Sequence, residues 1–311
     1  MAPGGRASSS ATSVRTDDLT KRFGTRRGVE GVTIEVRDGE VFGFLGPNGA
    51  GKSTTIRLLM GLQRPSRGVA RVLGLDPVAD GAAVRRDVGY LPGELALFPR
   101  LTGRETLERL GGARDLRDTG WRDSLIERFG AEIDRPVRTL SKGNRQKIGL
   151  VQAFMHRPRL LILDEPTSGL DPLLQEEFSR LIQEVSADGV TVFLSSHDLD
   201  EVQRLASTVA IIREGHVVAV DTVDGLRRTA PQVIELRFAH PPRTRFADLP
   251  GVSVTAQGER DVTLGVTGPV SAVLRAAVSD DVTGITARPV DLEELFLRYY
   301  GPLAEEPHHA H

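Results

Sequence analysis

A glycine-rich segment has the residue types and spacing of a phosphate-binding loop. It reads Gly46-Pro47-Asn48-Gly49-Ala50-Gly51-Lys52-Ser53-Thr54, in which glycine and four further residues precede Gly-Lys-Ser. Glycines let the backbone turn its N–H groups toward one concave site, and the N-terminus of a following helix adds positive potential there. Lys52 would contact the β and γ phosphates of a nucleotide, and the Ser53 hydroxyl would bind Mg²⁺. A strand-to-helix turn that binds nothing is the alternative, which the complete motif disfavours.

Two carboxylates follow a buried strand further along the chain. Asp164 and Glu165 come directly after the apolar run Leu160 to Leu163, at the edge where open α/β sheets bind ligands. Asp164 suits a Mg²⁺ contact, and Glu165 is then free to polarise an attacking water as a general base. A solvated acidic turn is the alternative, but a preceding phosphate loop favours the catalytic interpretation.

A histidine follows a third apolar run. His197 comes after Val192 to Leu194 and the polar pair Ser195-Ser196, where a neutral imidazole could reach the γ-phosphate. A lone histidine is more often structural, but here the other motifs converge on the same edge of the sheet. Lys52, Glu165 and His197 are therefore the predicted catalytic residues of a nucleotide hydrolase.

The segments that position these residues have the pattern of an α/β fold. From Leu19 to about Val220, short apolar strands alternate with helical segments, which is typical of a mostly parallel sheet covered by helices. Val41 to Leu45 and Leu160 to Leu163 are apolar throughout and are expected to be central strands. Val190 to Leu194 and Val209 to Ile212 extend the series.

The remainder of the chain predicts a small α+β domain. Strands with one polar face are expected at Val233 to Ala239, Val252 to Val254 and Val262 to Val266, and a short helix at Ser271 to Val278. Asp291 and Glu294 resemble a capping box at the start of a last amphipathic helix. The expected divisions are a disordered tail over residues 1–13, an α/β domain over 14–225, the α+β domain over 226–302 and a flexible tail over 303–311.

Composition excludes several classes of function. The 311 residues are 39% hydrophobic and carry a net charge of -2, so no overall basic field recruits nucleic acid or anionic lipid. Cysteine is absent, which excludes disulfides, thiol nucleophiles and thiolate metal sites. No window approaches the roughly 20 consecutive apolar residues of a membrane-spanning helix. We therefore expect a soluble chain that does not bind nucleic acid.

Together these motifs resemble those of the nucleotide-binding subunits of ABC transporters. Leu140-Ser141-Lys142-Gly143-Asn144 corresponds to the LSGGQ signature of that family, and Ser141 is a good N-cap for the following helix. The resemblance implies a P-loop NTPase fold with a small helical subdomain. It also implies that Ser141, Gly143 and Asn144 complete the ATP site of a second copy of the chain. An ordinary capped helix is the alternative.

Two further residues match the family by position. Asp171 ends Ser168-Gly169-Leu170-Asp171, which is similar to the D-loop, and Phe23 is placed like the aromatic residue that stacks on adenine. Phe23 could instead be a packing aromatic. Gly93 departs from the family, which usually has a glutamine there that touches the metal and signals to the membrane subunit. Either Glu94 supplies this metal contact from the next position, or the contact is lost.

The resemblance also implies partners and a location. Asp291 to Leu297 is similar to the ending of ATPase subunits that serve ABC-2-type exporters. An ATPase of that kind would use ATP and Mg²⁺ to drive drug or antibiotic export through a separate membrane permease. It would be cytoplasmic, on the inner face of the membrane, and would touch the membrane only through the permease. Leu97 to Thr102 lies where the family docks that partner, although its apolar residues could equally be covered within the chain.

Three alternatives stay open beside the exporter. An importer ATPase would often carry a C-terminal β-barrel with more strands than are expected here. A soluble ABC ATPase of translation or DNA repair would usually have a second cassette, a coiled coil or a zinc insertion. A non-hydrolysing regulatory subunit is disfavoured by the presence of Lys52, Asp164, Glu165 and His197.

Overall fold

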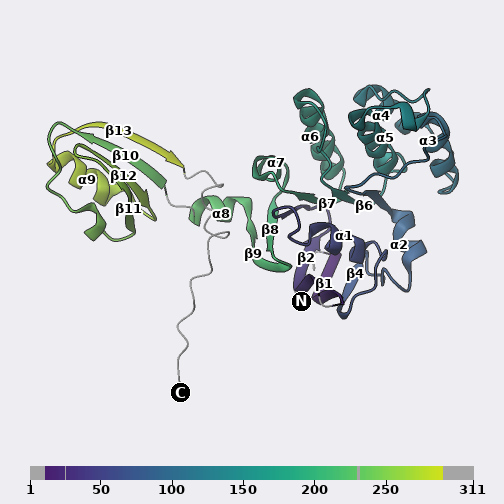
Figure 1. Ribbon diagram of the computed structural model, residues 1–311, viewed down its shortest axis with the longest axis horizontal. Coiled ribbons are helices and arrows are strands. Elements are labelled where there is room, and N and C mark those ends of the chain that lie inside the picture. The colour runs from purple at the N-terminus through teal and green to yellow at the C-terminus, as the bar shows by residue number, and fades with distance from the viewer. Residues whose placement is uncertain (1–10, 25, 230–231, 290–311) are drawn as a thin grey trace, which may run out of the picture. The chain divides into compact units, whose positions relative to one another are not determined.

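The computed structural model describes residues 11–24, 26–229 and 232–289 (Figure 1). The chain divides into two compact units, Met1–Asp221 and Thr222–His311, a division slightly earlier than the expected one after residue 225. The prediction that the disordered tail extends to residue 13 is wrong. Thr12 and Ser13 belong to the first strand, and the Ser13 hydroxyl bonds to Asp38 and Thr191.

A six-stranded sheet forms the centre of the first unit, in the order β5-β6-β7-β3-β8-β9. Its strands are β3 (Val41–Leu45), β5 (Val88–Leu91), β6 (Leu160–Asp164), β7 (Thr191–Ser196), β8 (Thr208–Arg213) and β9 (His216–Thr222). Neighbours from β5 to β8 pair in parallel, and every residue of β3, β6 and β7 is buried. The α/β prediction is confirmed, but β7 continues two residues past Leu194 to include Ser195 and Ser196.

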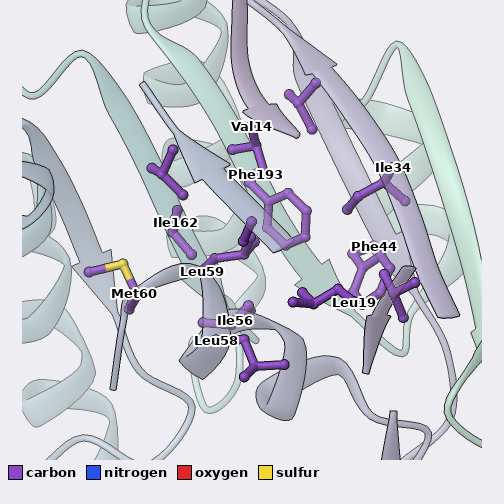
Figure 2. Packing of buried hydrophobic residues seen from close by; sticks show 14 of the residues in the cluster. Val14, Leu19, Ile34, Phe44, Ile56, Leu58, Leu59, Met60, Ile162 and Phe193 are labelled. Carbon is purple, nitrogen blue, oxygen red and sulfur yellow. The ribbon is translucent and has the colours of Figure 1, made fainter. Parts of the chain in front are cut away.

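A smaller antiparallel sheet packs in the same unit, in the order β2-β1-β4. Its strands are β1 (Thr12–Phe23), β2 (Arg26–Arg37) and β4 (Arg67–Val72). Figure 2 shows side chains of both sheets and of helix α1 (Lys52–Leu59) meeting in one core. Phe193 lies at its centre, with ring centroids 5.6 Å from Phe42 and 5.5 Å from Phe44. This core fixes α1, the helix that follows the phosphate loop, against β2, β4 and β6.

The other helices of the first unit lie on the sheet or form a helical subdomain. They are α2 (Gly81–Asp87), α3 (Gly103–Gly112), α4 (Gly120–Phe129), the 3₁₀ turn Val137–Thr139, α5 (Lys142–Phe154), α6 (Pro172–Ala187) and α7 (Leu199–Leu205). Helices α3, α4 and α5 pack together, as expected for the helical subdomain (Figure 1). The Trp121 indole N–H ties α4 to α5 by donating to the Phe154 carbonyl at 3.0 Å.

The second unit has the expected α+β composition in its described part. Four antiparallel strands run in the order β11-β12-β10-β13 and share a core with α9. The elements are α8 (Val223–Thr229), β10 (Gln232–Phe238), the 3₁₀ turn Phe246–Asp248, β11 (Val252–Gln257), β12 (Asp261–Val266), α9 (Ser271–Ser279) and β13 (Val282–Pro289). The helix expected from Asp291 lies outside the described residues. Within the described ranges, no helix is long and apolar enough to cross a membrane.

Candidate active site

The phosphate loop joins the end of β3 to the start of α1. The first N–H groups of a helix lack internal partners, so those at the start of α1 are available to an anion. Gly46 has no room for a side chain, because a Cβ atom there would lie 2.4 Å from the Ile212 carbonyl oxygen. Gly51 has a φ of 115°, which residues with side chains rarely adopt. Both glycines are therefore required by the shape of the loop.

A cleft of about 230 Å³ opens above this loop. Its lining residues are Phe23, Gly28, Pro47, Asn48, Gly49, Gly51, Lys52, Ser53, Thr54 and Glu165. Phe23 is 44% exposed and comes from the end of β1. A Cβ atom on Gly28 would lie 2.8 Å from the Phe23 ring, so the glycine makes room for it. Of the loop residues predicted to bind nucleotide, Gly46 and the buried Ala50 do not line the cleft.

The three predicted catalytic side chains meet at Glu165. Lys52 Nζ lies 3.1 Å from Glu165 Oε1, and His197 Nδ1 lies 2.7 Å from Glu165 Oε2. Lys52 is almost fully buried and also donates to the Gly46 carbonyl at 2.5 Å. Glu165 has a φ of 52°, a conformation that costs a non-glycine residue about 1–2 kcal/mol. Strands β3, β6 and β7 are neighbours in the sheet, which brings their carboxyl ends together.

Asp164 lies deeper than Glu165 and is held by β7. Its Oδ1 accepts a hydrogen bond from Ser195 Oγ at 2.5 Å. A Cβ atom on Gly93 would lie 3.0 Å from Asp164 Oδ2. Gly93, which stands where the family usually has a glutamine, therefore lies directly beside this carboxylate. Glu94, the next residue, has an exposed side chain. The position expected to hold a metal-contacting glutamine thus faces Asp164, and no side chain extends from it.

The signature residues do not line the cleft of their own chain. Ser141 caps α5 by accepting from the Asn144 N–H at 3.1 Å, as its residue type predicts. Asn144 bonds through both side-chain atoms to the backbone of Glu132, at 2.8 and 2.7 Å. A Cβ atom on Gly143 would lie 3.0 Å from the Gly169 carbonyl oxygen, and Asp171 caps α6. The amide of Asn144 therefore already has partners within the chain.

The segment Leu97 to Thr102 is only partly covered by the chain. Leu97 and Leu101 are half-buried, whereas Phe98 is 42% exposed. The Arg109 guanidinium lies 5.4 Å from the centre of the Phe98 ring. One of the apolar side chains of this segment thus remains accessible in the described structure.

The structure adds polar residues that the sequence analysis did not select. Gln146 is buried on α5 and donates from Nε2 to the Pro166 carbonyl at 2.9 Å, one residue after Glu165. Its position in line with buried Leu150 and Ala153, at helical spacing, was the available signal. Ser195, Ser196 and Glu201 are likewise buried next to the site.

The chain is similar to ATP-binding proteins of known transport and resistance systems. The ABC transporter family matches residues 29–168. The bacitracin transport ATP-binding protein BcrA of Bacillus licheniformis is 35% identical over 74% of this chain and 76% of its own length. The daunorubicin resistance ATP-binding protein DrrA3 of Streptomyces coeruleorubidus is 35% identical over 93% of this chain and 96% of its own length.

Solved structures agree with these relatives. An ATP-binding subunit of an ABC transporter is 33% identical, has a TM-score of 0.65, and covers 70% of this chain and 92% of its own. A dimeric ATP-binding cassette bound to ADP and phosphate has a TM-score of 0.62 at 23% identity, over 68% of this chain and 98% of its own, and shows the same fold. With its phosphate loop, signature segment and Glu165 in one unit, the chain belongs to the ATP-binding, ATP-hydrolysing proteins of the ABC transporter family.

Proposed function

We propose that this ATPase drives the export of a drug or antibiotic through a separate membrane permease, as an ABC-2-type exporter subunit. The relatives named for bacitracin transport and daunorubicin resistance support this proposal. The daunorubicin resistance protein matches over 308 residues, so the similarity extends into the second unit. An importer or a soluble ABC ATPase has no comparable support.

The contact of Glu165 with both Lys52 and His197 carries the catalytic proposal. Glu165 is the general base that takes a proton from the attacking water, since its carboxylate lies at the rim of the cleft beside the phosphate loop. His197 orients Glu165 through their 2.7 Å contact and is placed to meet the γ-phosphate. Lys52 gives positive charge to the phosphates, which are better acceptors than the loop carbonyls that it bonds here. Phe23 would stack on the base.

Magnesium fits the oxygen atoms at this site. In the described part of the chain, no group of three or more His, Cys, Asp or Glu side chains is arranged to hold a metal ion by itself. The Ser53 hydroxyl, the Asp164 carboxylate and phosphate oxygens are the hard donors that Mg²⁺ prefers. When bound, Mg²⁺ would neutralise phosphate charge. We propose Glu94 as a further donor, because Gly93 brings the chain beside Asp164.

The location of the signature residues supports action as a pair. Ser141, Gly143, Asn144 and Asp171 lie outside the cleft, so the ATP site would be completed by the signature segment of a second copy. Ser141 Oγ still has its proton to donate. The permease would contact the segment around exposed Phe98. The chain would then work in the cytoplasm, at the inner face of the membrane and attached through the permease.

ATPase measurements on three variants test the catalytic proposal. Lys52→Ala should lose nucleotide binding, whereas Glu165→Gln should bind ATP but lower kcat by about 100-fold or more and accumulate as a dimer. Glu214→Gln is the matched control. Glu214 is also a glutamate with positive φ, at 49°, but it does not line the cleft. Unchanged turnover in Glu165→Gln would contradict the assignment of Glu165 as the general base.

A further inference from the structure

The two serines that end β7 connect the active site to different partners. Successive side chains of a strand point to opposite faces. Ser195 Oγ donates to Asp164 Oδ1 and accepts from the Glu165 N–H at 3.3 Å. Ser196 Oγ instead donates to Glu201 Oε2 of α7, at 2.5 Å. The end of β7 therefore binds the acidic pair on one side and a third carboxyl group on the other.

Glu201 is buried to a degree that carboxyl groups rarely reach. Its exposed fraction is 2%, and its Oε1 atom is buried with no hydrogen-bond partner of good geometry in the described part of the chain. Burial raises the pKa of Glu201, while the hydroxyl groups of Ser196 and Thr167 lower it and the charges of Asp198 and Glu165 raise it further. An apolar residue would avoid this desolvation cost, so burial alone does not explain a carboxyl group at this position.

The contacts of Glu201 lead to the residues on either side of His197. Ser196 Oγ, which donates to Glu201, also accepts from the Asp198 N–H at 3.0 Å. The residues before and after His197 are therefore hydrogen-bonded to each other through the Ser196 hydroxyl. The Asp198 carboxylate in turn accepts from the Glu201 N–H at 3.2 Å.

We propose that Glu201 is a positioning residue for hydrolysis, which holds the segment that carries His197 in place through Ser196 and Asp198. The proposal rests on the proposed roles of Glu165 and His197. Glu201 does not line the cleft, so in this proposal it does not contact the nucleotide. Its loss should therefore lower turnover and leave the affinity for ATP nearly unchanged.

Steady-state kinetics on four variants test this role in the full-length chain. Glu201→Ala and Ser196→Ala should each lower kcat about 10-fold or more and change KM for ATP less than about twofold. Glu201→Gln should stay within about threefold of wild-type kcat, because the amide oxygen still accepts from Ser196 Oγ. The double variant of Ser196→Ala with Glu201→Ala should be no slower than the slower single variant, since both remove one contact.

Val202→Ala separates positioning from folding. Val202 is a fully buried neighbour on α7 and carries no polar group. If it lowers kcat as much as Glu201→Ala at equal loss of melting temperature, or if KM rises with the fall in kcat, the proposal is overturned. Should Glu201→Ala not fold, Ser196→Ala and Glu201→Gln decide the matter. An active Glu165→Gln variant would instead contradict the assignment of Glu165 as the general base. That outcome does not depend on the Glu201 variants, so the two proposals can fail separately.

Discussion

At the scale of single residues, Glu165 shows how one side chain is held for chemistry. Its positive φ turns the backbone away from the direction of β6, directly after the buried Asp164. Its two carboxylate oxygens then face different partners, Lys52 and His197. The strained backbone persists because the Glu165 N–H bonds to the Ser195 carbonyl at 3.1 Å. Ser195 thus holds Asp164 by its hydroxyl and the Glu165 N–H by both its carbonyl and its hydroxyl oxygen.

Phe23 gives a prediction at this scale. Phe23→Ala should raise KM for ATP about fivefold or more with kcat nearly unchanged, because base–aromatic stacking contributes about 1–3 kcal/mol to binding. Steady-state ATPase kinetics measure both constants. Phe98→Ala is the matched control, since Phe98 is similarly exposed but does not line the cleft. Equal KM values for Phe23→Ala and wild type would show that Phe23 does not stack on the base.

At the scale of elements, α5 links the signature segment to the segment that follows Glu165. The helix begins at the Ser141 cap and packs against α3, α4 and β5. Gln146 of this helix donates to the Pro166 carbonyl. Gly143 packs against Gly169 of the same segment. The segment expected to meet the second copy and the segment that carries Glu165 are therefore in contact within one chain.

Gln146→Met tests this link. The substitution keeps the length of the side chain but removes the hydrogen bond, and leaving a buried carbonyl unpartnered costs about 1–3 kcal/mol. We expect a lower free energy of unfolding and a fall in kcat, measured by urea denaturation and ATPase assay. Gln152→Met is the control, because Gln152 also donates from α5 to a backbone carbonyl, that of Tyr90, at 3.3 Å. An equal fall in kcat in both variants would argue against a specific link.

At the scale of the whole molecule, stability depends on a buried histidine away from the active site. His156 Nε2 lies 3.3 Å from the Val88 carbonyl, and its Nδ1 is buried without a partner among the described residues. Burial, with repulsion from Arg114, lowers the pKa of His156 to about 4. Protonation in the folded chain would place an N–H group where no acceptor lies. The imidazole is therefore kept neutral by its surroundings.

The sign of the resulting pH effect follows from proton binding. Between pH 6.5 and about 4 the unfolded histidine binds a proton that the folded one does not. The stability that His156 contributes is thus complete above pH 6.5 and decreases as the pH falls through that window, by about 3 kcal/mol. Urea unfolding at several pH values should show a weaker acid dependence for His156→Leu than for wild type. His216→Leu controls for the loss of any histidine, and an unchanged slope in His156→Leu would contradict the prediction.

Local motifs were predictable because they are contiguous. Residue type and spacing predict the local backbone conformation of three motifs: the phosphate loop, the acidic pair after an apolar run and the serine cap of α5. The central strands were predictable because burial on both faces leaves them apolar throughout. The end of β7 was harder to predict, because Ser195 and Ser196 are polar residues buried in a strand. Their hydroxyl groups donate hydrogen bonds to Asp164 and Glu201, which belong to other elements.

The sequence by itself determined the α/β fold and the phosphate-binding motif of this ATPase, and it predicted that an acidic residue takes part in hydrolysis. Tertiary structure alone decided the sheet order that places β7 between β6 and β3, and hence the meeting of His197, Glu165 and Lys52. It also decided that Glu132 binds the Asn144 amide and that Gly93 lies against Asp164. The reason is that contacts between distant residues depend on how strands are ordered and packed, which spacing along the chain does not encode.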